Sequence, residues 1–376
     1  MQQAVRVGIL GCGVVGAAIA YELSQVPGLA ITVLDRRSPD QWEATGAALG
    51  VLMAALSQKK GGSLSRRLAS LQRYETLVPE LEARTGYKIP YNRQGILYLC
   101  FDQAELMRWQ ATASLRASQG FLLKIIDLAE LRTHYPALSH ARALDTAQPL
   151  VGAVHSTADR QIDPVRLTTA LVKAAQDQGV IFNFQTAVQG FRQTTAAPRQ
   201  VKSIQTQQTE LAVDWLVLAS GLGSTLLSTE LQQPVDVRPV LGQALHLQLP
   251  QPLAAPDWPV ISGLDVHLVP VSSREFWVGA TVEFPDHYPD GVIQPDAQRL
   301  AALRQQAIAF CPALADATVT RTWSGLRPRP ENRPAPIVER LDNYSNVLLA
   351  TGHYRNGVLL APITAEKIRQ MISTHL

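Results

Sequence analysis

The chain has 376 residues, of which 46% are hydrophobic and 17% charged, and its formal net charge is +3. This size and composition predict about two globular domains with large cores. The scattered basic residues argue against nucleic-acid binding, and the three widely spaced cysteines show neither metal-ligand spacing nor a disulfide framework. No apolar run reaches the length of a membrane-spanning helix, so we expect a soluble, cytoplasmic protein.

The first element is a complete βαβ unit. It consists of an apolar, β-rich run at residues 5–10, the turn Gly11-Cys12-Gly13-Val14-Val15-Gly16, an apolar helix over 17–26 and a second strand over 30–34 that ends at Asp35. A G-x-G-x-x-G sequence alone is weak, but inside such a unit, with an acid at this distance, it strongly indicates a dinucleotide site.

Each glycine of this turn has a distinct role. Gly11 permits the tight turn, Gly13 lets a pyrophosphate approach the backbone, and Gly16 lets the helix pack close to the sheet. The free N–H groups at the helix start favour phosphates. Asp35 can accept hydrogen bonds from a ribose, whereas Arg36, directly after it, is of the type that suits a 2′-phosphate. The motif by itself does not choose between NAD and FAD.

Further elements follow from periodicity and turn residues. Helical patterns cover residues 63–84, 103–119, 163–179, 295–310 and 356–372. Strand patterns cover 95–101, 122–126, 180–184, 187–191, 201–206, 215–219, 245–249, 267–271, 276–278, 318–323 and 346–350. Ala219-Ser220-Gly221 forms a second glycine turn at the carboxyl end of a strand, where open α/β sheets bind ligands.

The predicted alternation of strands and helices at the start of the chain returns at its end, after a stretch of short strands. We therefore expect an α/β fold (α+β overall), with a Rossmann-like cofactor domain and an inserted substrate domain built on a mainly antiparallel sheet. The expected cofactor domain comprises residues 1–85, 150–235 and 325–376, and the substrate domain comprises 86–149 and 236–324.

Four further segments carry a family resemblance. They are ATGAALG at 44–50, ASG at 219–221, WSGLRP at 323–328 and GHYRNGVLLAP at 352–362. With these segments and the N-terminal motif, nearly the whole chain resembles the D-amino-acid-oxidase-like flavoproteins. Within them it resembles the glycine oxidases of thiamine biosynthesis, above all in the last segment.

The resemblance implies an FAD-binding domain, and its FAD is expected to be non-covalent because Cys311 does not match the position of covalent attachment in relatives. The start of the last helix would lie beside the flavin, where a helix N-terminus can stabilise negative charge. The cofactor-binding residues that we expect are Gly11, Gly13, Val14, Val15, Gly16, Asp35, Arg36, Ala44, Thr45, Gly46, Ala47, Ala48, Gly50, Val188, Ala219, Ser220, Gly221, Arg327, His353, Tyr354, Arg355, Asn356, Gly357 and Val358.

Three residues are expected at the substrate end. Arg327 matches the family arginine that binds the substrate carboxylate, and its planar guanidinium suits that partner. His267 stands where relatives often carry a tyrosine, and it either contacts the substrate or is a structural histidine. Tyr354 is a further pocket candidate, whereas His353 is expected to pack or hydrogen-bond near the flavin.

The implied activity is FAD-dependent oxidative deamination of glycine, sarcosine and small D-amino acids. Hydride would pass from Cα to flavin N5, giving the imine or oxo acid, ammonia and, with oxygen as acceptor, hydrogen peroxide; in thiamine biosynthesis the imine would supply the thiazole. An alternative is a D-amino-acid dehydrogenase with a quinone acceptor, and a third reading is a flavin-binding module without turnover. The expected partners are a small amino acid and oxygen, with no nucleic acid, metal or membrane span, and the resemblance allows a homo-oligomer.

Overall fold

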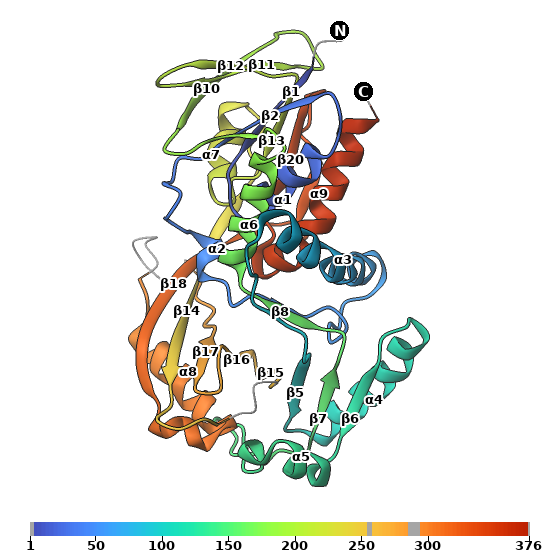
Figure 1. Ribbon diagram of the computed structural model, residues 1–376, viewed down its shortest axis with the longest axis vertical. Coiled ribbons are helices and arrows are strands. Elements are labelled where there is room, and N and C mark those ends of the chain that lie inside the picture. The colour runs from blue at the N-terminus through green and yellow to red at the C-terminus, as the bar shows by residue number, and fades with distance from the viewer. Residues whose placement is uncertain (1–3, 254–257, 285–293, 375–376) are drawn as a thin grey trace.

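A computed structural model describes residues 4–253, 258–284 and 294–374 of the chain. Within these residues the strands form a six-stranded sheet, an eight-stranded sheet and two three-stranded sheets. The six-stranded sheet and its helices fill the upper half of the molecule in Figure 1, and the eight-stranded sheet fills the lower half. The expected α/β architecture with a second, largely antiparallel sheet is confirmed.

The six-stranded sheet is parallel except for its edge strand β19. Its order is β19 (Ile337–Arg340), β20 (Val347–Thr351), β13 (Trp215–Leu218), β1 (Val5–Leu10), β2 (Leu29–Leu34) and β9 (Ile181–Asn183). Side chains alternate across β1, so Val7 and Ile9 belong to one core and Leu10 to another.

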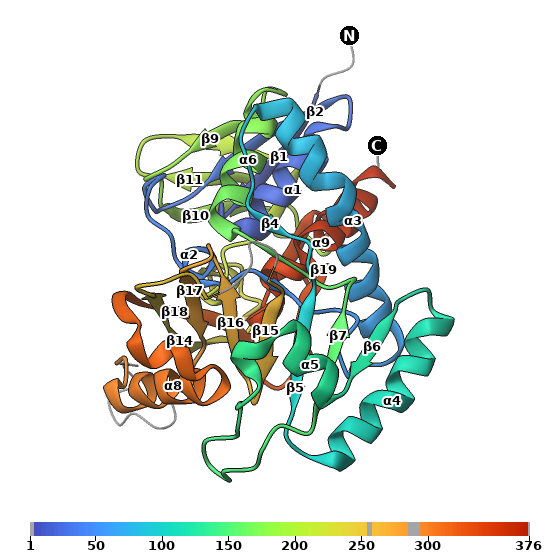
Figure 2. The same ribbon diagram turned by 60° about the horizontal axis from the view of Figure 1, so that its bottom comes forward.

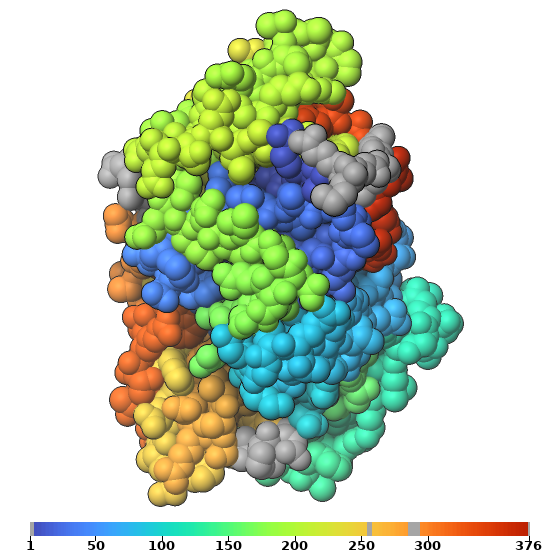
Figure 3. Space-filling model, turned by 45° about the horizontal axis from the view of Figure 1, so that its top comes forward, coloured from blue at the N-terminus to red at the C-terminus, as the bar shows by residue number. Residues whose placement is uncertain are grey.

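These two cores lie on opposite faces of the sheet. Four helices cover the first face: α1 (Val14–Ser24), α3 (Gly61–Thr85), α6 (Pro164–Gln176) and α9 (Gly357–Ser373). The second face is covered by helix α7 (Gly223–Glu230) and by a three-stranded sheet of β10 (Val188–Gln193), β11 (Val201–Thr206) and β12 (Glu210–Ala212). This small sheet forms one end of the molecule, yellow-green in Figure 3.

The eight-stranded sheet is antiparallel except where β15 lies parallel to β5. Its order is β18 (Thr318–Pro330), β14 (Val237–Gln248), β17 (Glu275–Gly279), β16 (Val266–Pro270), β15 (Val260–Gly263), β5 (Ile96–Cys100), β7 (Gly152–Ser156) and β6 (Leu123–Ile126). Helices α5 (Leu128–His134) and α8 (Ala297–Phe310) pack on its outer face, and α4 (Gln103–Ser118) lies beside β6 (Figure 2).

Between the two halves lie α2 (Ala44–Ala47) and the strands β3 (Val51–Leu52), β4 (Tyr91–Asn92) and β8 (Arg160–Ile162), which form the second three-stranded sheet. Of the 3-10 helices, η1 (Pro136–Leu138) and η3 (Pro312–Asp316) pack with α5 and α8 beside the eight-stranded sheet, and η4 (Tyr354–Asn356) directly precedes α9. In the described part of the chain no helix is both long and apolar enough to span a membrane.

Local sequence signals set several element ends. Asp163 caps α6, because its carboxylate accepts hydrogen bonds from the N–H groups of Val165 and Arg166, both at 2.9 Å. Two strands are longer than their patterns suggested: β14 begins at Val237 and β18 continues to Pro330. Residues 152–156 and 325–330, expected in the cofactor domain, form β7 and the end of β18 in the eight-stranded sheet. The domain boundaries otherwise stay a prediction.

Candidate functional site

A cavity of about 1280 Å³ extends from the start of α1 to the inner face of the eight-stranded sheet. It brings together most residues that the sequence proposed, although they come from distant segments. Those that line it are Gly11, Gly13, Val14, Val15, Asp35, Arg36, Ala44, Thr45, Ala47, Ala48, Gly50, Val188, Ala219, Ser220, Gly221, His267, Arg327, His353, Tyr354, Arg355, Asn356, Gly357 and Val358. Gly16 and Gly46 are not among the lining residues.

In the turn before α1, glycines allow the backbone to approach neighbouring backbone segments closely. Gly11 has φ of +99°, and a Cβ there would lie 2.7 Å from the carbonyl oxygen of Ala219. A Cβ on Gly16 would lie 1.9 Å from the carbonyl oxygen of Gly11, so Gly16 serves the packing of helix on turn rather than the cavity surface. Gly46 serves packing in the same way, against Trp42.

Gly13 differs from these glycines because it leaves open space. A Cβ there would meet only Thr45 Oγ1, at 3.2 Å, and the residue lines the cavity. The first helical hydrogen bond of α1 runs from Ala17 N–H to Gly13 O, so the helix gives the N–H groups of Val15 and Gly16 no carbonyl partner. A bare backbone beside a helix N-terminus fits the pyrophosphate of FAD.

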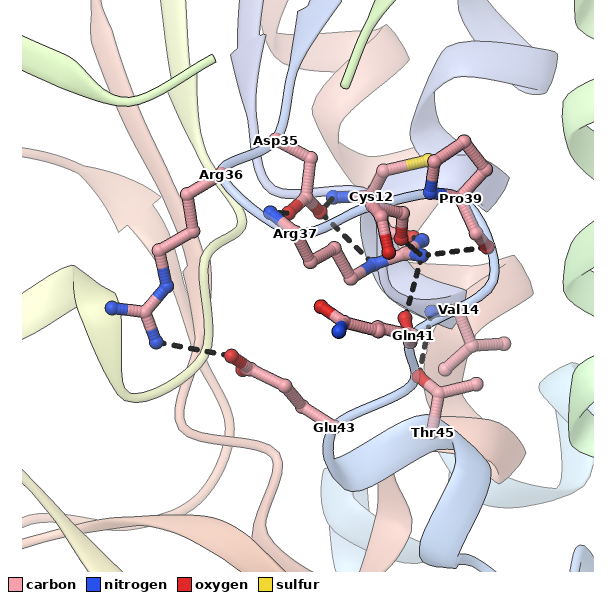
Figure 4. A network of polar contacts seen from close by, with 10 residues as sticks. Cys12, Val14, Asp35, Arg36, Arg37, Pro39, Gln41, Glu43 and Thr45 are labelled. Atoms are coloured by element: carbon pink, nitrogen blue, oxygen red, sulfur yellow. Dashed lines mark hydrogen bonds and ion pairs between the residues drawn. The ribbon is translucent and has the colours of Figure 1, made fainter. Parts of the chain in front are cut away.

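Asp35 lines the cavity, and its carboxylate also forms hydrogen bonds and an ion pair within the protein (Figure 4). Its Oδ2 accepts a hydrogen bond from Cys12 N–H at 2.6 Å, and its Oδ1 accepts one from Arg37 N–H at 2.9 Å. The guanidinium of Arg37 lies 3.3 Å from the same carboxylate. Asp35 therefore fixes the glycine-rich turn, and its expected bond to a ribose stays a prediction.

Arg37 is a residue that the sequence reasoning passed over. Its side chain is buried and donates to the carbonyl oxygens of Cys12, Ser38, Pro39 and Gln41, at 2.6 to 3.1 Å. It thereby shapes the loop between β2 and α2, while its exposed neighbour Arg36 pairs with Glu43 at 3.0 Å (Figure 4). Its only sequence signal was a second arginine after the acid.

Arg327 lies on β18, and its side chain lines the part of the cavity that is formed by the eight-stranded sheet. Its Nη1 donates to the carbonyl oxygen of Leu241 at 3.1 Å. Burial and the nearby charge of Arg355 lower the pKa of Arg327, but a guanidinium stays protonated. Among the described residues the carboxylate of Glu283 acts on Arg327 as a nearby charge that raises this pKa. A half-buried cation that faces a cavity is suited to an anionic ligand.

His267 stands on the same inner face of the sheet, on β16. Its Nδ1 lies 2.9 Å from Ser262 Oγ on the neighbouring strand β15. Burial, together with the positive charges of Arg355 and Arg327, lowers the pKa of His267 to about 4. The imidazole is thus neutral at pH 7, and whether it contacts a substrate stays a prediction.

The loop before α9 completes this end of the cavity. Arg355 pairs with Asp265 at 3.2 Å, which joins η4 to the turn between β15 and β16. Tyr354 has φ of +52°, which is unfavourable for a residue with a side chain, and such backbone strain is common at functional sites. Arg67 from α3 donates to Asn356 Oδ1 at 2.8 Å.

His353 is buried behind this loop, and its Nε2 lies 3.0 Å from Thr364 Oγ1, while its expected place near the flavin stays a prediction. Burial lowers the pKa of His353 to about 4. Because the unfolded chain takes up this proton near pH 6.5 and the folded chain only near 4, the stabilisation is complete above pH 6.5 and is lost as the pH falls towards 4.

We expect the free energy of unfolding of the wild type to fall between pH 7.5 and 4 by about 3 kcal/mol more than that of His353→Gln. Urea unfolding of the FAD-free proteins at several pH values measures this difference, with the exposed His140→Gln as the control. Parallel pH profiles of the wild type and His353→Gln would contradict it.

Asp159 is a second residue that the sequence did not single out. Its buried carboxylate accepts hydrogen bonds from the N–H groups of Ala54, Ala55 and Leu56, at 2.7 to 3.0 Å. These bonds hold the loop after β3, of which Leu56 lines the cavity. One acid in a loop carries no sequence pattern, so only the folded contacts disclose it.

The described residues contain no group of three or more His, Cys, Asp or Glu side chains placed to hold a metal ion. Cys12, Cys100 and Cys311 are buried, and none of the three lines the cavity. Burial raises the pKa of the Cys12 thiol to about 12.

Comparisons with known proteins identify the family of the chain. Residues 6–371 match the family model of the FAD dependent oxidoreductases (DAO). The bifunctional protein ThiO/ThiG of Synechocystis sp. is 33% identical over 378 residues, which are 99% of this chain and 52% of the relative. The chain thus spans about half the length of the bifunctional relatives that it matches.

Glycine oxidases match over nearly their whole length. That of Geobacillus kaustophilus is 27% identical over 367 residues, covering 97% of this chain and 92% of the relative. The crystal structure of glycine oxidase from this organism superposes with a TM-score of 0.84 at 25% identity, covering 99% of this chain and 95% of that one. The chain belongs to the FAD dependent oxidoreductase family, whose cofactor is FAD.

Proposed function

We propose that the protein oxidatively deaminates glycine and similarly small amines, such as sarcosine and small D-amino acids, with non-covalent FAD as cofactor and oxygen as electron acceptor. For glycine, the overall reaction would convert glycine, oxygen and water into glyoxylate, ammonia and hydrogen peroxide. Bound FAD would supply the acceptor for the hydride that leaves the substrate Cα.

The observation that carries this proposal is the placement of Arg327. Its guanidinium faces the same cavity as the glycine-rich start of α1, so a cation suited to an anion and the turn expected to bind the dinucleotide share one cavity. A planar guanidinium matches a carboxylate through two parallel hydrogen bonds. We infer that Arg327 binds the substrate carboxylate and thereby orients the substrate Cα.

The remaining groups at this end set orientation and charge. His267 is neutral, and with Nδ1 beside Ser262 its Nε2 is the ring nitrogen left for a substrate. Arg355 lines the cavity and pairs with Asp265 at 3.2 Å. A site in which cations outnumber carboxylates favours the neutral amine over the ammonium form, and it is the neutral amine that can release hydride from Cα.

The relatives support both the activity and a biosynthetic role. Glycine oxidases match the chain over nearly its full length, and the bifunctional ThiO/ThiG proteins match it over about half of theirs. We propose that the product of glycine oxidation serves thiamine thiazole formation. In that role the glycine imine would be consumed before it hydrolyses.

A peroxide assay over glycine, sarcosine, D-alanine and D-proline tests the proposal, with a quinone analogue as acceptor in a parallel series. Peroxide formation with glycine supports the oxidase. Turnover with the quinone alone would instead support the dehydrogenase. If anaerobic addition of every amino acid left the FAD absorbance unchanged, the protein would be a flavin-binding module without turnover. Acid precipitation should release the yellow colour into the supernatant, because no cysteine lines the cavity.

A further inference from the structure

We infer that Gly242 positions the guanidinium of Arg327, because the absence of a side chain at residue 242 leaves the strand surface on which that group lies. The inference rests on the proposed function, in which Arg327 binds the substrate carboxylate. Gly242 would be a positioning residue that acts through Arg327, without contact to the substrate.

The strand register explains how the two residues meet. β14 and β18 are antiparallel, and Gly242 lies directly opposite Gly325. Arg327 is two residues beyond Gly325, so its side chain emerges on the same face of the sheet. Diagonal neighbours across an antiparallel pair are within reach of long side chains, which brings the guanidinium over Gly242.

The distances show that the guanidinium occupies the space of a Cβ at this position. A Cβ on Gly242 would lie 2.1 Å from Nη2, 2.3 Å from Cζ and 2.4 Å from Nη1 of Arg327. The Nη1 atom also donates to the carbonyl oxygen of the preceding residue, Leu241, at 3.1 Å. The guanidinium therefore lies against the backbone of β14, and one of its nitrogens donates a hydrogen bond to that backbone.

The neighbouring positions cannot take over this role. A Cβ on Gly325 would lie 2.2 Å from the Cβ of Ala47, so the surface at Gly325 is covered by α2. Val240, directly opposite Arg327, is fully buried. Leu241 is held in place from the other side by two backbone hydrogen bonds with Glu283. The bare surface at Gly242 is thus the one on which the guanidinium lies.

A methyl group at residue 242 could be accommodated by a movement of the Arg327 side chain. The three nearest atoms that it would meet all belong to the far end of one flexible side chain, that of Arg327. The guanidinium should move while the sheet stays in place. Because a misplacement of about 1 Å can cost about 100-fold in rate, the loss should appear in carboxylate binding and turnover.

The experiment compares holoenzymes of the wild type, Gly242→Ala, Arg327→Ala and the double variant. Glycolate, a carboxylate that lacks the amine, is titrated while the visible absorption of bound FAD is followed, and KM and kcat for glycine are measured separately. For Gly242→Ala we expect weaker glycolate binding and about 100-fold lower kcat/KM for glycine, with unchanged FAD content. The control is Gly62→Ala, whose Cβ would meet only Arg66 Nη1, at 3.4 Å.

The double variant shows whether Gly242 acts through Arg327. Once the guanidinium is gone, adding Gly242→Ala should change glycolate binding no further. An equal loss in both backgrounds would overturn the inference, as would normal glycolate binding by Gly242→Ala when Arg327→Ala binds it weakly. Normal binding by Arg327→Ala would instead refute the carboxylate assignment in the proposed function.

Folding gives a further readout. If Gly242→Ala fails to fold while the double variant folds and retains FAD, the clash lies with the guanidinium, and the inference stands. If both fail to fold, the glycine is needed by the sheet itself, and the inference is wrong.

Discussion

Arg327→Ala should lower kcat/KM for glycine by about 2–5 kcal/mol of transition-state binding, a loss of roughly 30- to 5000-fold. The half-buried guanidinium is the expected partner of the substrate carboxylate, and its removal would leave that charge without a counterion in the cavity. Steady-state kinetics with glycine measures the loss. Arg327→Lys should restore only part of it, since an ammonium keeps the charge but lacks the planar fork.

A matched control lies on the same strand. Arg321 is exposed on β18, rests on the ring of Trp323 and does not line the cavity. Arg321→Ala should leave kcat/KM within about twofold of the wild type, because exposed charges contribute little. An unchanged kcat/KM in Arg327→Ala would show that Arg327 does not bind the substrate carboxylate.

Gly13→Leu should give a folded protein without FAD. The backbone of Gly13 has φ of −72°, which any residue adopts, and a Cβ there would meet only one atom within 4 Å. The new side chain would therefore fill the cavity at the start of α1 without disturbing the sheet. The ratio of flavin to protein absorbance, together with the far-UV spectrum and the melting temperature, checks both halves of this expectation.

Gly16→Val provides the contrast, since its side chain would meet the backbone of Gly11 and the protein should fail to fold. A Gly13→Leu protein purified with a full complement of FAD would show that this glycine does not face the cofactor.

The sequence predicted the cofactor half well, because its signals are local. The motif from Gly11 to Gly16, the strand before it and the acid after it lie within one βαβ unit, and the N-cap at Asp163 lies next to its helix. The segment after Trp323 was harder to predict. Gly325, Pro328 and Pro330 suggest a turn, yet these residues continue β18.

The reason is that pairing outweighed local preference. β18 is the edge strand of its sheet, where prolines are tolerated, and it pairs with β14 along nearly its whole length. Arg37, Asp159 and Gly242 were missed for a related reason. Each acts through residues that only the fold brings near, and a single arginine, aspartate or glycine in a sequence does not show what it will touch.

The contact between Gly325 and Ala47 constrains how such an enzyme can change its substrate. The strand that carries Arg327 packs closely against Ala47 of α2 at Gly325, so the backbone of this strand cannot shift without moving α2 as well. The opposite wall, from Ser262 to His267, touches the cavity through side chains on a short hairpin. Substitutions that adapt the enzyme to larger amines, in nature or in a mutant library, should therefore accumulate in that hairpin, while the residues of β18 stay unchanged.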